Sequence, residues 1–113
     1  MNQSIALLGL GSNLGDRQAY LDAALSRLTQ CGRLESQSRV YETQPVGLAW
    51  QPVFLNLACR LGTTLPPHEL LSACQEIEAG LGRRNTTRNG PRIIDIDILL
   101  YDSLVLNDSD LVI

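Results

Sequence analysis

The chain has 113 residues, is 44% apolar and carries a formal net charge of −3 at pH 7. That length fits one domain, residues 1–113, with a single core, and no apolar run reaches the roughly 20 residues that cross a bilayer. The acidic balance argues against a nucleic-acid binder, because such proteins neutralise phosphates with a basic surface. From the composition we therefore expect neither a membrane protein nor a general nucleic-acid binder.

The N-terminus and the cysteines predict a cytoplasmic protein. Residues 1–4 lead directly into an apolar segment, without the basic region and cleavage site of a secretory signal. The three cysteines, Cys31, Cys59 and Cys74, are odd in number and widely spaced. This pattern favours reduced, buried thiols over a disulfide framework or a zinc site.

The first third of the chain predicts a strand followed by a helix. The apolar run at residues 5–10 predicts a buried strand, and we expect the glycines at 9, 11 and 15 to form the tight turn after it. Asp16 or Asn13 can cap the helix that follows. Its apolar residues recur at the spacing of one helical face: Leu21, Ala24, Leu25 and Leu28.

Two strands and a second helix are predicted next. Residues 34–42 predict a weaker strand, and residues 43–52 form a loop with two prolines and a glycine. Residues 54–61 then alternate, as in a half-buried strand. One face carries Leu55, Leu57, Cys59 and Leu61, and the other Phe54, Asn56, Ala58 and Arg60. A helix starting at Pro66 or Pro67 has an apolar stripe of Leu70, Cys74, Ile77 and Leu81.

Residues 93–101 predict the last strand and complete the order β-α-β-β-α-β. This order is typical of the ferredoxin-like α+β fold, an antiparallel sheet with helices packed on one side. In the last strand we expect one face to be apolar, with Ile94, Ile96, Ile98 and Leu100. Asp95 and Asp97 then share the opposite face, roughly 7 Å apart along the strand. The two carboxylates either face solvent or bind a cation such as Mg²⁺, which takes oxygen ligands.

A cluster of arginines favours the interpretation that Asp95 and Asp97 bind a cation. All nine basic residues are arginines, and four lie within ten positions: Arg83, Arg84, Arg88 and Arg92. Guanidinium groups make bidentate contacts with phosphate oxygens. Arginines in a polar loop are otherwise explained as solvated surface. Beside two carboxylates, however, the cluster indicates a site for a nucleotide polyphosphate.

Three segments resemble the 6-hydroxymethyl-7,8-dihydropterin pyrophosphokinase family. They are Gly11-Ser12-Asn13-Leu14, Phe54-Leu55-Asn56 and Gly90-Pro91-Arg92-Ile93-Ile94-Asp95-Ile96-Asp97-Ile98-Leu99, in the family's order. The resemblance spans residues 5–112. It implies an ATP-dependent diphosphokinase of folate biosynthesis, which transfers pyrophosphate from MgATP to 6-hydroxymethyl-7,8-dihydropterin and gives the pterin diphosphate and AMP.

The resemblance also implies roles for individual residues. Asp95 and Asp97 would bind two Mg²⁺ ions, and Asp95 would also contact the substrate, while Arg83 and Arg92 would be catalytic contacts to phosphate. The expected ATP-binding positions are Gln75, Glu78, Arg83, Arg88, Arg92 and Ile98. The expected pterin-binding positions are Thr43, Val46, Phe54 and Asn56.

Two departures from the family pattern bear on this interpretation. Asn89 occupies the place of a common tryptophan, and the family continues past Ile113 with a segment that supplies a histidine, an arginine and an aromatic residue. We therefore expect a truncated member, with a natural short form as the alternative, and its catalytic competence is open. We expect a monomer, with a dimer or aggregation through the truncated end as the alternative. The rival to an enzyme is a non-catalytic ferredoxin-like module that binds a nucleotide or a pterin.

Overall fold

The computed structural model of the protein describes residues 3–44, 53–82, 93–104, 111 and 113. In these ranges the chain forms a five-stranded sheet and two helices. Their order is β1 (Ser4–Ser12), α1 (Arg17–Leu28), β2 (Arg33–Gln37), β3 (Tyr41–Thr43), β4 (Phe54–Thr63), α2 (Pro67–Gly80) and β5 (Asp95–Tyr101). Residues 45–52 of the predicted loop and residues 83–92, which hold the arginine cluster, lie outside the described residues.

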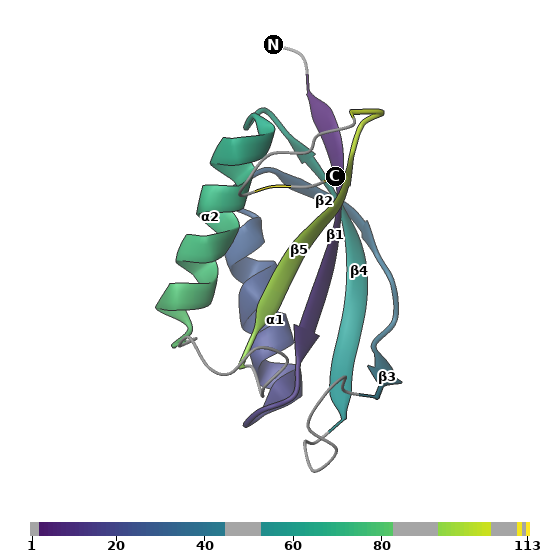
Figure 1. Cartoon of the computed structure of the whole chain (residues 1–113), viewed down its shortest axis with the longest axis vertical. Helices are drawn as coiled ribbons and strands as arrows, with labels where there is room; N and C mark the ends of the chain where they lie inside the picture. The colour runs from purple at the N-terminus through teal and green to yellow at the C-terminus, as the bar shows by residue number, and fades with distance from the viewer. Residues whose placement is uncertain (1–2, 45–52, 83–92, 105–110, 112) are drawn as a thin grey trace.

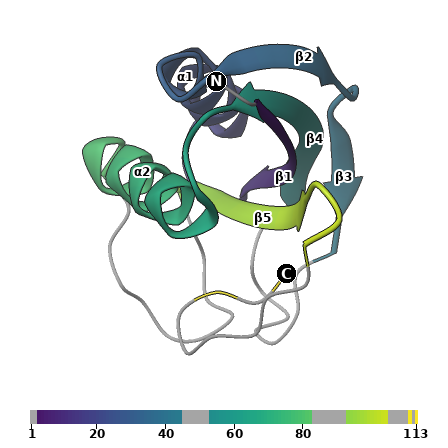
Figure 2. The same ribbon diagram turned by 90° about the horizontal axis from the view of Figure 1, so that it is seen from above.

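The sheet is antiparallel and its helices lie on one side. The strands are ordered β2-β4-β1-β5, with β3 also paired to β4, and every pair is antiparallel. Both helices pack on the same face (Figures 1 and 2), α1 against β1 and β4 and α2 against β5. The predicted α+β class is confirmed, and the arrangement is compatible with the ferredoxin-like fold.

The segment predicted as one strand over residues 34–42 is two strands, β2 and β3, that pair with the same partner. The interruption has a local cause at Ser38. Its hydroxyl accepts a hydrogen bond from the amide of Ala58 at 2.9 Å, while its own amide donates to the Ala58 carbonyl at 2.7 Å. Because the side chain takes the place of a main-chain acceptor, the regular ladder stops here.

Both helices begin where the sequence predicts, and α1 buries its four predicted residues. In α2 the predicted Leu70, Cys74 and Ile77 are buried, but Leu81 lies past the end of the helix and is only partly buried. Asp16 caps α1, and its carboxylate accepts a hydrogen bond from the amide of Ala19 at 3.2 Å. In α2, Pro67 is the first helical residue, where a missing N–H costs nothing. Among the residues that the structure describes, no helix has both the length and the apolar character needed to cross a membrane.

The core lies between the sheet and the helices. β1 contributes Ala6, Leu8 and Leu10, and β4 contributes Leu57, Cys59 and Leu61. All three cysteines are free thiols, as predicted, with Cys59 and Cys74 buried. Burial raises the pKa of Cys59 to about 11 and that of Cys74 to about 12, so both stay protonated at neutral pH.

The prediction of which β5 residues face the core is confirmed up to Ile98 and is wrong at Leu100. Ile94, Ile96 and Ile98 are buried, but Leu100 is 54% exposed and Tyr101 enters the core instead. The reason is a β-bulge: Leu8 pairs with Ile98 whereas Leu7 pairs with Leu100, so Leu99 is an extra residue. An extra residue reverses the alternation of side chains beyond it.

Candidate functional site

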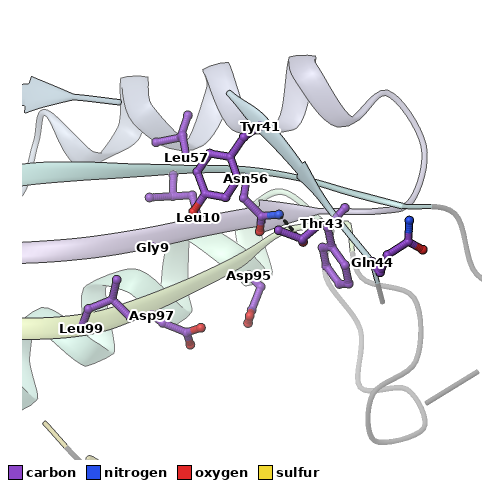
Figure 3. A pocket seen from close by; sticks show the side chains of 12 residues that line it. Gly9, Leu10, Tyr41, Thr43, Gln44, Asn56, Leu57, Asp95, Asp97 and Leu99 are labelled. Atoms are coloured by element: carbon purple, nitrogen blue, oxygen red, sulfur yellow. Dashed lines mark hydrogen bonds between the residues drawn. The ribbon is translucent and has the colours of Figure 1, made fainter. Parts of the chain in front are cut away.

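The sheet face opposite the helices carries a cavity of about 350 Å³. That volume lies at the lower end of the range for small-molecule sites. Side chains from four strands surround it (Figure 3). Its described lining is Gly9, Leu10, Gly11, Tyr41, Thr43, Gln44, Phe54, Asn56, Leu57, Asp95, Asp97 and Leu99.

Two glycines of β1 form the floor of this cavity. Gly9 and Gly11 were expected in the turn after the strand, but both lie inside β1, and Gly15, with φ of +74°, makes the turn. A Cβ atom on Gly11 would lie 2.7 Å from Oδ1 of Asn56 and 3.4 Å from the ring of Phe54. Glycine is therefore the residue that leaves space for these two side chains.

The cross-strand register places the polar residues on either side of that floor. Gly11 pairs with Asn56 of β4 on one side and with Asp95 of β5 on the other. Gly9 pairs with Asp97 in the same way. The prediction that the two aspartates share a face is confirmed, since both line the cavity and point to the same side of the sheet (Figure 3).

Asn56 is oriented by a hydrogen bond from its amide group. Nδ2 donates to the hydroxyl of Thr43 at 2.6 Å, across the pairing of β3 with β4. The predicted alternation of β4 is also confirmed, because Phe54 and Asn56 line the cavity while Cys59 and Leu61 are buried in the core. An aromatic ring next to a fixed carboxamide suits a flat heterocycle, which can stack on one and hydrogen-bond to the other.

The aspartates have the donor set that Mg²⁺ requires. Mg²⁺ binds through one or two carboxylates together with waters and substrate phosphates, rather than in an all-protein cage. Across the described ranges, no group of three or more His, Cys, Asp or Glu side chains could hold a metal ion. As two carboxylates that line one cavity, Asp95 and Asp97 fit a magnesium ion whose other ligands come with the substrate.

Several predicted site residues do not line the described cavity. Gln75 is exposed on α2, and Glu78 is buried on the same helix. The side chain of Ile98 is in the core, on the opposite face of β5 from the aspartates. Val46, Arg83, Arg88 and Arg92 lie outside the described residues.

Other residues of the cavity were not predicted. Tyr41 follows a strand break, and Leu99 reaches the cavity because of the β-bulge in β5. Neither the break nor the bulge has a sequence pattern of its own. The glycines could have been found, because Gly9 and Gly11 alternate with Leu8 and Leu10 at the period of a strand.

The described fold is an α+β sheet with a cavity on its open face, of a size that suits a small molecule and lined by two carboxylates that suit a metal-bound phosphate. A family model described as 7,8-dihydro-6-hydroxymethylpterin-pyrophosphokinase matches residues 7–113. The chain belongs to this family, whose members are pyrophosphokinases of folate biosynthesis.

Curated relatives agree with the family match. The chain is 46% identical to a 2-amino-4-hydroxy-6-hydroxymethyldihydropteridine pyrophosphokinase of Methylorubrum extorquens, over 96% of this chain and 70% of that protein. It is 43% identical to the protein of the same name in Bacillus subtilis, over 97% of this chain and 67% of the relative. It is also 42% identical to the folic acid synthesis protein FOL1 of Dictyostelium discoideum, over 96% of this chain but only 16% of that longer protein.

Proposed function

We propose that this chain transfers the pyrophosphoryl group of MgATP to 6-hydroxymethyl-7,8-dihydropterin, forming the pterin diphosphate and AMP in folate biosynthesis. The observation that carries the proposal is one cavity that combines Phe54 and Asn56 with Asp95 and Asp97. The first pair suits a flat heterocycle and the second a metal-bound phosphate. The family match supports the same pairing of substrates.

Phe54, Asn56 and Thr43 would bind the pterin. The ring of Phe54 stacks on the heterocycle, and the carboxamide of Asn56 pairs with its polar edge. The hydrogen bond from Asn56 to Thr43 supports this role, because it fixes the rotamer before the substrate arrives. Val46 remains a predicted further wall of this pocket.

Asp95 and Asp97 would bind the polyphosphate of ATP through metal ions. Two Mg²⁺ ions bound there, when present, would neutralise the polyphosphate and align it for in-line transfer. The substrate hydroxymethyl oxygen attacks the β-phosphorus and loses its proton, the bond from that phosphorus to the α,β-bridging oxygen breaks, and AMP leaves with that oxygen. Asp95, which is directly across from Gly11 and hence nearer to Asn56, would also contact the pterin side.

The nucleotide contacts of the proposal rest on the resemblance. Arg83 and Arg92 would act on the phosphates, and Arg88, Gln75 and Ile98 would lie near the nucleotide. The single-domain organisation, the monomeric state and the cytoplasmic location also remain predictions.

A steady-state assay of AMP and pterin diphosphate tests the proposal. We expect both products in equal amounts from MgATP and the pterin alcohol, and none when Mg²⁺ is removed with EDTA. Saturable binding of both ligands without AMP release would favour the rival, a non-catalytic binding module. Absence of pterin binding would contradict the assignment of Phe54 and Asn56.

A further inference from the structure

Glu78 is a buried carboxylate in an unfavourable place. It lies in the last turn of α2, which ends at Gly80, and it is only 7% exposed. The C-terminal end of a helix disfavours negative charge, and a buried carboxylate is costly unless it is hydrogen-bonded. Such a residue needs a compensating interaction with a neighbouring element.

One such interaction is with the backbone of β5. Oε2 of Glu78 accepts a hydrogen bond from the amide of Ile96 at 2.8 Å. In the described sheet β5 is an outer strand, paired with β1 on one edge, and α2 packs against it. The carboxylate therefore satisfies an N–H that would otherwise be unpaired in the strand ladder.

The bonded amide is the peptide link between Asp95 and Ile96. Asp95 and Asp97 flank Ile96, and their side chains point into the cavity while that of Ile96 is buried in the core. In a pleated strand, the orientation of one peptide group sets the direction of the side chains on both sides of it. Glu78 thus binds the strand segment whose alternation directs both carboxylates into the cavity.

We propose that Glu78 is a positioning residue, which fixes β5 through the Ile96 amide so that Asp95 and Asp97 converge on one metal-bound phosphate. The proposal rests on the proposed function for the role of the aspartates. It differs from the nucleotide contact that the resemblance implies for Glu78. Substitution of a residue that positions the aspartates should weaken only the Mg²⁺-dependent binding of the nucleotide. Substitution of a nucleotide contact should weaken binding both with and without Mg²⁺.

The test compares Glu78→Ala, Glu78→Gln and Glu78→Asp with Glu76→Ala. Glu76 is exposed on the same helix, so its substitution removes one negative charge without touching β5. Glutamine keeps an acceptor of the same length, while aspartate keeps the charge but is one methylene too short. In the protein without ligands, we expect the Ile96 amide to exchange its hydrogen about tenfold faster in Glu78→Ala and Glu78→Asp. Glu78→Gln and Glu76→Ala should match the unmodified protein.

The second measurement is the affinity for a non-hydrolysable ATP analogue, by calorimetry with Mg²⁺ and with EDTA. We expect about a tenfold loss for Glu78→Ala with Mg²⁺, the scale of removing a partner that orients a metal ligand, and no loss with EDTA. Glu78→Gln should restore the Mg²⁺-dependent affinity. If Glu78→Ala does not fold, Glu78→Asp carries the same expectations.

Two results would overturn the proposal. Unchanged exchange at Ile96 in both Glu78→Ala and Glu78→Asp would show that the carboxylate does not hold the strand. An equal loss of affinity with Mg²⁺ and with EDTA would make Glu78 a nucleotide contact instead. If the unmodified protein binds the analogue without any dependence on Mg²⁺, the proposed function of the aspartates fails. The exchange at Ile96 then still decides whether Glu78 holds β5.

Discussion

The two faces of the sheet use the same strands for different purposes. On β1, Ala6 and Leu8 are buried in the core, whereas Gly9 and Gly11 line the open cavity. On β5, Ile96 is buried and its neighbours Asp95 and Asp97 reach the open face. The period of two along a strand therefore separates residues for stability from residues for binding. Substitutions at adjacent positions should give opposite phenotypes.

The largest effect is expected at Asp97 on the open face. Asp97→Asn keeps the shape of the side chain but removes the charge that the proposed metal-bound phosphate requires. We expect kcat to fall about 10³-fold, the scale of losing a key charge contact in phosphoryl transfer, with no change in melting temperature. A steady-state AMP assay together with thermal unfolding checks both parts. A variant with unchanged kcat would contradict the assignment of the open face to the reaction.

A large loss of stability is expected at Leu8 on the covered face. Leu8 is fully buried, so Leu8→Ala should lower the free energy of unfolding by about 2–5 kcal/mol. Leu7→Ala, next to it on the open face, is the matched control and should cost much less. Urea unfolding measures both variants, and pterin affinity below the transition should stay unchanged. Equal costs for the two leucines would show that the faces are wrongly assigned.

A smaller effect is expected at the glycine floor. In Gly11→Ala the new Cβ would lie 2.7 Å from Oδ1 of Asn56, so Asn56 must move and its bond to Thr43 weakens. A hydrogen bond is worth about 1 kcal/mol, so we expect pterin affinity to fall roughly fivefold. In Gly9→Ala the nearest atom is the end of the flexible Leu99 side chain at 3.2 Å, which can give way. Fluorescence titration with the pterin should rank the two variants in this order.

The smallest effect concerns Asp102, at the turn after β5, away from both faces. Its carboxylate accepts a hydrogen bond from the amide of Ile5 at 2.7 Å, which lowers its pKa below the usual value near 3.8. A lowered pKa adds stability above about pH 3.8, and that stability disappears as the pH falls through the folded-state value. We expect the melting temperatures of the unmodified protein and Asp102→Asn to converge in this acid range. A constant difference between pH 2 and 6 would contradict the linkage.

The periodicity of the sequence predicted most of the fold and the two pairs of polar or aromatic residues that line the cavity. Alternation placed Phe54 with Asn56 and Asp95 with Asp97, because a strand with one buried face constrains its side chains strongly. The bulge at Leu99 and the break at Ser38 could not be predicted, since each depends on pairing with a distant strand. The hydrogen bond from Ile96 to Glu78 likewise joins elements that only the tertiary fold brings together.

The central claim is that the open face of the sheet binds the metal and the nucleotide. Paramagnetic broadening of amide NMR signals tests it directly, with Mn²⁺ in place of Mg²⁺ and a non-hydrolysable ATP analogue. We expect the strongest broadening at Gly9, Gly11 and the Asp95–Asp97 segment, and loss of this effect in Asp97→Asn. Broadening centred instead on the groove between the helices, at Arg27 and Glu76, would contradict the account.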